Sequence, residues 1–199
     1  ADDAIHGCLL FRPLPKQFDD RTVRAALAPE KDIDGITDGS LAGVFTNTDL
    51  GYAPCTAQAC LEILKYYNVP LSGKRAVVVG RSLVVGKPAA MMLDRENATV
   101  TLCNSRTQNL PALCREADVV VVAMGKMGAV GADCLRKGQT VVDVGIHVNE
   151  EGKLCGDVKF AEAEPVVDAI TPVPGGVGTV TTSVLVGHVV QAAAKKAGL

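Results

Sequence analysis

Two glycines six positions apart, Gly80 and Gly86, bracket the segment of this chain best suited to hold a ligand. The apolar run 77–79 leads into Gly80, and Pro88 follows Gly86. The first glycine lets a strand end in a tight bend, the second lets the backbone approach a ligand or a sheet, and proline suits the first turn of a helix. The segment therefore predicts a turn whose backbone N–H groups could bind a phosphate. An ordinary strand-to-helix connection without a ligand stays open, because the spacing is not Gly-x-Gly-x-x-Gly.

Three further short runs rich in β-branched residues follow, separated by segments of helical length, at 98–103, 117–123 and 139–145. This pattern is typical of parallel strands buried on both faces. It predicts an α/β fold with a Rossmann-like, doubly wound parallel sheet, whose ligand crevice lies at the carboxyl ends of the strands. Those ends carry Gly80, Ser105, residues 123–125 and residues 145–146.

The end of the second strand indicates which nucleotide would bind. Dinucleotide folds that prefer NAD place a carboxylate there for the ribose 2′-hydroxyl, whereas an arginine accommodates a 2′-phosphate. Here residues 103–107 contain Ser105 and Arg106 but no acid, and Arg81 enters from the glycine turn. NADP is therefore the predicted cofactor, with NAD possible. The alternative that both arginines are solvated loop cations stays open, because surface arginines are common.

Composition excludes several other classes of protein. The net charge of −2 over 199 residues provides no basic surface for nucleic acid. No apolar stretch is expected to approach a membrane span, and the first residues lack the features of a signal peptide. The seven cysteines form no C-x-x-C pair and the three histidines no ligand spacing, so we expect free thiols, a cytoplasmic location and no metal site.

The chain is expected to divide near residue 70. Residues 1–70 contain a helix over 57–67 that Thr56 would cap, residues 71–178 form the nucleotide-binding domain, and residues 179–199 belong to a long helix from about 180 to 194 that packs back on the first part. Cys55 is expected to be a packed thiol, since no histidine or aspartate beside it in the sequence suggests activation.

Several rare strings, in order, resemble the methylenetetrahydrofolate dehydrogenase/methenyltetrahydrofolate cyclohydrolase family, and the resemblance spans almost the whole chain. These strings are Lys-Asp-Ile-Asp-Gly at 31–35, Pro-Cys-Thr at 54–56, residues 79–88, Asp-Val-Gly-Ile at 143–146, Gly-Asp-Val at 156–158 and residues 170–178. The resemblance implies NADP- or NAD-dependent oxidation of 5,10-methylenetetrahydrofolate to the methenyl form. It also implies a folate-side α/β domain, of which residues 1–70 would be the C-terminal part, a cleft between the two domains, and a homodimer.

Two departures from the family pattern matter. The family's Tyr-x-x-x-Lys motif, with its active-site lysine, would lie upstream of this chain, which therefore resembles an N-terminally truncated member. Phe11 stands where bifunctional members have glutamine, and Thr179-Val180 where Pro-Met is usual. These residues favour a dehydrogenase-only branch. A bifunctional enzyme and a fragment that binds nucleotide without turnover are the alternatives.

The resemblance also implies roles for individual residues. Asp34 would hydrogen-bond the pterin as the catalytic and substrate-binding carboxylate, although the Asp-x-Asp-Gly string alone is more typical of a turn residue that caps its own backbone. Further substrate contacts would come from Pro174, Gly175, Gly176 and Val177, and cofactor contacts from Gly80, Arg81, Ser82, Ser105 and Ile146.

Overall fold

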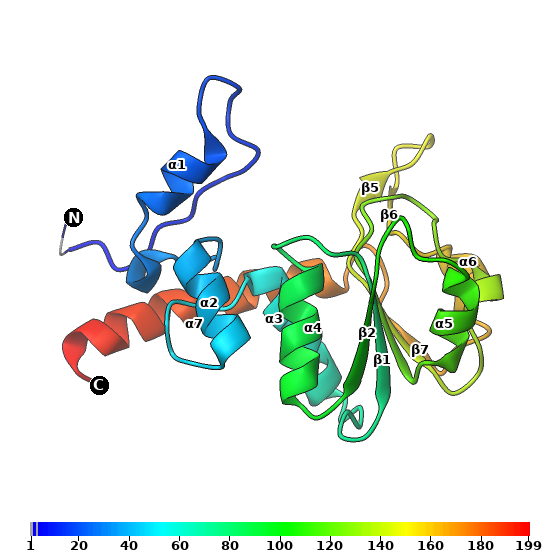
Figure 1. Cartoon of the computed structure of the whole chain (residues 1–199). Helices are drawn as coiled ribbons and strands as arrows, with labels where there is room; N and C mark the ends of the chain where they lie inside the picture. The colour runs from blue at the N-terminus through cyan, green and yellow to red at the C-terminus, as the bar shows by residue number, and fades with distance from the viewer. Residues whose placement is uncertain (1, 3) are drawn as a thin grey trace.

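A five-stranded parallel sheet organises the computed structural model, which describes residue 2 and residues 4–199 (Figure 1). The strand order is β2-β1-β3-β4-β7, and every neighbouring pair is parallel. A separate antiparallel hairpin, β5–β6, follows the fourth sheet strand. The strands are β1 Arg75–Val79, β2 Thr99–Cys103, β3 Val119–Val122, β4 Thr140–Asp143, β5 His147–Val148, β6 Leu154–Cys155 and β7 Ala169–Ile170.

Helices cover both faces of this sheet, which confirms the predicted doubly wound α/β fold. On one face lie α3, α4 and the start of α7, and on the other lie α5 and α6. The helices are α1 Asp20–Ala25, α2 Asp38–Thr46, α3 Cys55–Tyr66, α4 Gly86–Arg95, α5 Leu110–Glu116, α6 Phe160–Ala163 and α7 Val177–Ala197, with 3₁₀ turns at Pro29–Lys31 and Ala132–Cys134.

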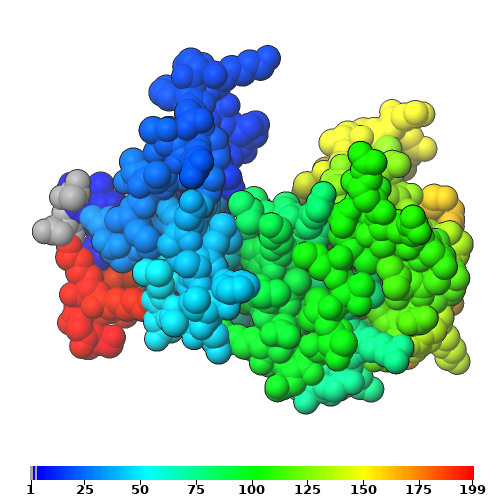
Figure 2. Space-filling model, viewed as in Figure 1, coloured from blue at the N-terminus to red at the C-terminus, as the bar shows by residue number. Residues whose placement is uncertain are grey.

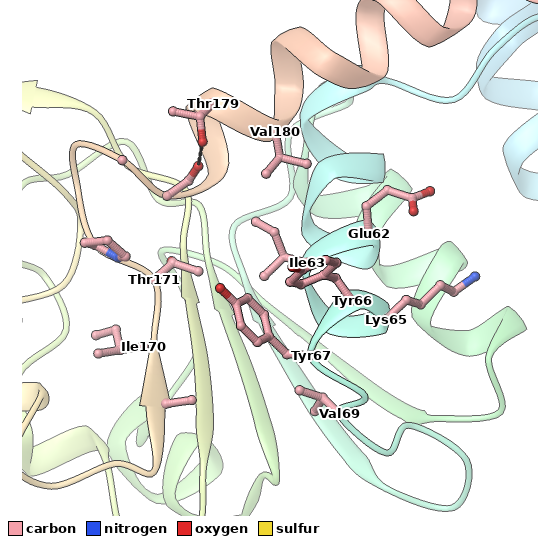
Figure 3. Close-up of a pocket in the computed structure, with 14 residues that line it drawn as sticks. Glu62, Ile63, Lys65, Tyr66, Tyr67, Val69, Ile170, Thr171, Thr179 and Val180 are labelled. Carbon is pink, nitrogen blue, oxygen red and sulfur yellow. Dashed lines mark hydrogen bonds between the residues drawn. The ribbon is translucent and has the colours of Figure 1, made fainter.

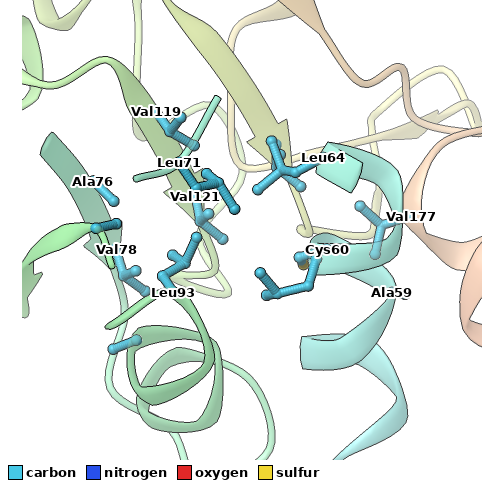
Figure 4. Close-up of a cluster of buried hydrophobic side chains, with 14 of the residues drawn as sticks. Ala59, Cys60, Leu64, Leu71, Ala76, Val78, Leu93, Val119, Val121 and Val177 are labelled. Atoms are coloured by element: carbon cyan, nitrogen blue, oxygen red, sulfur yellow. The ribbon is translucent and has the colours of Figure 1, made fainter. Parts of the chain in front are cut away.

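The central strands are rich in valine because both of their faces are buried. Side chains alternate, so that Val78 and Val121 pack against α3 and α4, whereas Val77 and Val120 pack toward α5 and α6. Figure 4 shows the first of these clusters, where Leu64 of α3 meets the strand side chains. Because α3 and the sheet share this core, the glycine turn at the carboxyl end of β1 follows a well-packed strand.

The expectation of burial on both faces is wrong for β2. This strand lies at the edge of the sheet and pairs only with β1. Thr99, Thr101 and Leu102 are exposed, and only Cys103 is buried. Edge position, which β-branched composition alone does not reveal, explains the difference.

Two helix starts also differ from expectation. Helix α3 begins at Cys55 with Pro54 at its N-cap, so Thr56 lies inside the first turn and is not the cap. Helix α7 begins at Val177, because the glycine-rich string 175–178 enters the helix instead of ending before it. Helix α7 packs along α3, and its buried residues are Val177, Val184, His188 and Ala192.

The expectation that no apolar stretch approaches a membrane span is wrong for α7. This helix spans 21 residues with a mean hydropathy of 1.3, enough by length and composition to cross a membrane. Val186 and Val190 are exposed on it, whereas Val177 and Val184 join the core beside α3. Length and hydropathy alone therefore do not distinguish this helix from a membrane span; its packing along α3 makes it part of the α/β fold.

The carboxyl ends of the strands face one side of the molecule (Figure 1). From that side project both the N-terminal segment through α1, in blue, and the β5–β6 hairpin, in yellow, with an open recess between them (Figure 2). The division of the chain at residues 70 and 178 stays a prediction.

Candidate functional site

A crevice of about 230 Å³ lies at the carboxyl ends of β1, β2 and β3. Three of the four segments predicted to meet there do so, since Gly80, Ser105 and residues 123–124 all line it. The described residues that line it are Val79, Gly80, Arg81, Ser82, Asn104, Ser105, Ala123 and Met124. The topology of the parallel sheet thus brings segments more than 40 positions apart in sequence to one site.

Both glycines of the turn are required by close backbone contacts. Gly80 has a φ of 127°, which only glycine adopts readily, and a Cβ there would overlap the carbonyl oxygen of Ala123. A Cβ on Gly86 would overlap the carbonyl oxygen of Gly80. The two glycines therefore let three backbone segments approach one another at the edge of the crevice.

The turn leads from this crevice into the N-terminus of α4. Ser82 Oγ accepts a hydrogen bond from the Val85 N–H at 3.1 Å, and the Ser82 carbonyl accepts one from the Lys87 N–H at 3.0 Å. Val85, the N-cap residue, makes no side-chain capping bond. Backbone N–H groups at the start of a helix favour anions, so a phosphate could replace the missing cap.

The loop after β2 places Ser105 in the crevice and Arg106 outside its lining. Asn104 shapes this loop, because its side-chain oxygen accepts the Arg106 N–H at 3.0 Å. Arg81 and Arg106 are both exposed, and no carboxylate of the described residues belongs to the lining. Arg81 is therefore the cation that the fold brings to the crevice.

Residues 145–146 do not line this crevice. Ile146 is 67% exposed, and Gly145 packs against Asp157, which leaves no room for a Cβ. A cofactor contact by Ile146 stays a prediction.

Asp34 lies half-buried at the first turn after the 3₁₀ segment. Burial raises the pKa of the Asp34 carboxyl, and the nearby Cys55 thiol opposes that shift. The backbone-capping role belongs instead to Asp32, which is fully buried and accepts the N–H groups of Ile36 and Thr37 at 3.0 and 2.7 Å. Because Asp32 occupies the turn, the Asp34 carboxylate remains available to a ligand.

Cys55 is a packed thiol, as expected. It is 1% exposed, its Sγ donates to the Ile33 carbonyl at 3.2 Å, and burial raises its pKa to about 12. The sequence did not reveal its neighbour His188, whose Nδ1 lies 3.5 Å from that sulfur and 2.8 Å from the Ile33 carbonyl oxygen. The imidazole thus fixes the backbone next to Asp34 from a helix far along the chain.

The glycine-rich residues 174–177 differ in how accessible they are to a ligand. Pro174 and Gly175 are exposed and Gly176 is half-buried, so a ligand could reach all three. Val177 is 4% exposed and belongs to the buried cluster that also contains Leu64 (Figure 4), and a substrate contact by this residue stays a prediction.

A larger groove of about 890 Å³ lies beside β7 and the residues that follow this strand. Figure 3 shows it between α3, the edge strand β7 and the start of α7, with Tyr66 and Tyr67 on one wall and Ile170 and Thr171 on the other. Of the described residues 174–177, only Gly175 and Gly176 line this groove. The strand-end crevice, although smaller, is the one that unites the predicted cofactor residues.

We expect His188 to make the protein less stable in mild acid. Burial lowers its pKa, so between that value and the unfolded value of about 6.5 the unfolded chain binds more protons than the folded one. Its contribution to stability is complete above about pH 6.5 and is lost as the pH falls through the folded pKa. The melting temperature should therefore drop less from about pH 7.5 to about pH 5 in His188→Asn than in the wild type.

Asparagine suits this test because its amide nitrogen can donate to the Ile33 carbonyl in place of Nδ1. Asp34, whose raised pKa acts with the opposite sign, is present in both proteins. His6→Asn, on the N-terminal segment, is the matched control. Equal pH dependence in wild type and His188→Asn would refute the prediction.

Comparisons with known proteins agree with this geometry. The family model described as tetrahydrofolate dehydrogenase/cyclohydrolase, NAD(P)-binding domain, matches residues 54–197. A bifunctional protein FolD of Carboxydothermus hydrogenoformans is 58% identical over 190 residues, covering 94% of this chain and 66% of the relative. FolD of Alkaliphilus oremlandii is 50% identical over 191 residues, covering 96% and 67%. The chain thus spans about two thirds of the length of these relatives.

Solved structures are similar over the same range. The bifunctional FolD of Campylobacter jejuni superposes with a TM-score of 0.95 at 37% identity, covering 98% of this chain and 69% of that one. The Trypanosoma brucei enzyme, described as complexed with NADP cofactor and an inhibitor, has a TM-score of 0.89 at 35% identity, covering 96% and 67%. The family resemblance expected from the motifs is confirmed: the chain belongs to the tetrahydrofolate dehydrogenase/cyclohydrolase family.

Proposed function

We propose that this chain binds NADP in the strand-end crevice and contributes it to the oxidation of 5,10-methylenetetrahydrofolate to 5,10-methenyltetrahydrofolate. The observation that carries the proposal is the crevice itself, whose lining includes Arg81 and, among the residues that the structure describes, no carboxylate. The turn that forms one side of it leads into the N-terminus of α4. The NADP complex of the Trypanosoma brucei relative supports the choice of cofactor. NAD is the weaker candidate.

The residues present fit a dinucleotide phosphate. Two glycines allow the close backbone packing of the turn, Ser82 and Ser105 offer hydroxyl groups, and Arg81 offers a guanidinium that matches phosphate geometry. With a volume of about 230 Å³, the crevice would enclose only part of the cofactor. Bound NADP would supply the hydride acceptor. The protein's task is to hold the folate carbon and the nicotinamide at reacting distance.

On the folate side, we assign Asp34 to the pterin. Its half-buried carboxylate can accept hydrogen bonds from the ring's N–H groups, and His188 and Cys55 hold the adjacent Ile33 carbonyl in place. Pro174, Gly175 and Gly176 would offer backbone contacts where the absence of large side chains permits close approach. Arg106 and Ile146 would touch the cofactor only at its exposed edge.

Cyclohydrolase activity is the second candidate function. The relatives named above are described as bifunctional, which favours the two-activity reading over a dehydrogenase-only branch. Against it stands Phe11, 82% exposed, where the resemblance expects a glutamine that would serve the hydrolysis. Hydrolysis needs an activated water and proton transfers, which a phenyl group cannot assist.

The partners and location follow from the same proposal. We assign a tetrahydrofolate substrate, a homodimer and a cytoplasmic location, with no nucleic-acid or membrane partner. A net charge of −2 agrees with the absence of a nucleic-acid surface.

Calorimetry with residues 1–199 tests the cofactor assignment. NADP should bind at least about tenfold more tightly than NAD, which corresponds to about 1.4 kcal/mol from the 2′-phosphate. NAD binding as tightly as NADP would overturn the choice of cofactor. If neither nucleotide binds, the proposed function is wrong.

A turnover assay tests whether residues 1–199 catalyse the oxidation or only bind the cofactor. Because the resemblance places the active-site lysine outside this chain, residues 1–199 should oxidise methylenetetrahydrofolate poorly, as measured by NADPH absorbance. Robust oxidation would contradict that expectation. Loss of methenyltetrahydrofolate absorbance well above the uncatalysed rate would identify the bifunctional reading as the correct one.

A further inference from the structure

A fully buried carboxylate stands behind one wall of the crevice. Asp157, which follows β6, is 0% exposed and accepts hydrogen bonds from three consecutive backbone N–H groups. Its Oδ2 accepts from Met124 at 2.6 Å and from Gly125 at 2.9 Å, and its Oδ1 accepts from Lys126 at 2.8 Å. Burying a carboxylate costs free energy unless hydrogen bonds satisfy its lone pairs. The three backbone N–H groups supply such bonds to Asp157.

The loop that Asp157 holds is part of the crevice. Ala123 and Met124 line it, and the carbonyl of Ala123 lies against Gly80, where no Cβ would fit. Three N–H groups converging on one point form a concavity that attracts anions. Here the chain's own carboxylate fills that concavity from the side away from the crevice, so the wall keeps its shape without a ligand.

A histidine side chain also hydrogen-bonds the Asp157 carboxylate. His147 on β5 places Nε2 at 2.7 Å from Asp157 Oδ1, and its side chain is 23% exposed. Because a buried carboxylate only accepts, Nε2 carries the proton and donates. Asp157 itself is held by Asp143, whose Oδ1 accepts the Asp157 N–H at 3.0 Å. Burial raises the pKa of Asp143, opposed by three backbone N–H bonds.

We propose that Asp157 is a positioning residue for the cofactor wall and that His147 holds the Asp157 carboxylate in the orientation that shapes residues 124–126. This inference rests on the proposed function, because it assigns the wall to NADP. A wall formed before binding lowers the conformational cost of taking up the cofactor. Neither residue lines the crevice, so each acts through the loop.

Hydrogen exchange and calorimetry together test this inference. In the unliganded protein, His147→Ala should accelerate amide exchange at Met124, Gly125 and Lys126 by about tenfold, because one bond to the carboxylate is lost. Its dissociation constant for NADP should rise about fivefold. Asp157→Asn should have a larger effect on both, since an amide presents a single acceptor oxygen where the carboxylate presents two.

Two controls separate positioning from general stability. Val148→Ala changes the 65%-exposed neighbour of His147 and should leave exchange and NADP affinity unchanged. Asp143→Asn removes another buried carboxylate of the same network and should lower the melting temperature without accelerating exchange at 124–126 as strongly as Asp157→Asn does. If Asp157→Asn does not fold, His147→Ala decides.

The outcomes distinguish this inference from the proposed function. Wild-type exchange at 124–126 in His147→Ala overturns the inference, and so does faster exchange with unchanged NADP affinity. If the wild-type protein does not bind NADP, the proposed function fails and with it the assignment of the wall to that cofactor, whereas the exchange rates still show whether Asp157 and His147 shape the loop.

Discussion

Replacing Gly86 with valine is expected to weaken NADP binding by more than about a hundredfold. Even a Cβ at this position would overlap the carbonyl oxygen of Gly80 and lie 2.8 Å from the backbone nitrogen of Arg81. Both contacts involve backbone, which cannot move aside as a flexible side chain can. The turn must therefore open, and the helix N-terminus and Arg81 leave their places together. Calorimetry with NADP measures the loss.

The melting temperature should fall as well, because forcing extra atoms into a packed site costs about 1–3 kcal/mol. Gly187→Val is the matched control, since this helical glycine on α7 has open space where its Cβ would stand. The control should bind NADP like the wild type. A Gly86→Val protein with wild-type affinity would show that the turn does not contact the cofactor.

Replacing Arg81 with leucine is expected to weaken NADP binding by about 10- to 100-fold and NAD binding by less than about twofold. Arg81 is the arginine that lines the crevice, and a hydrogen bond to a charged group contributes about 1.5–3 kcal/mol. Only NADP carries the 2′-phosphate that would receive this bond. Titration of both nucleotides into the variant separates the two effects.

Two further arginine variants sharpen this result. Arg95→Leu, in the last turn of α4, removes an exposed arginine distant from the crevice and should change neither affinity. Arg106→Leu should have a smaller effect than Arg81→Leu, because Arg106 lies outside the lining. If Arg106→Leu alone loses NADP and Arg81→Leu does not, the assignment of the 2′-phosphate to Arg81 is wrong.

Local pattern was sufficient for the sheet and for the site's backbone. Runs such as Val77–Val78–Val79 predict buried strands because parallel strands exclude water on both faces, and the glycine spacing predicts the turn because only glycine tolerates such close approach. The same logic did not identify β2 as an exposed edge, or Pro54 as the N-cap of α3. Edge position and cap geometry depend on neighbours that composition does not specify.

The amino-acid sequence by itself determined the doubly wound fold, the glycine turn and the absence of an acid at the end of the second strand, since each is a property of residues close together in the chain. Only the tertiary structure decided which side chains distant in the sequence contact one another. Asp157 lies 31 to 33 positions from the N–H groups it accepts, and His188 lies 155 positions from Ile33. The Asp157 contacts form because parallel crossovers bring distant segments to one end of the sheet, and the His188 contact forms because α7 packs back along α3. No local periodicity encodes either meeting.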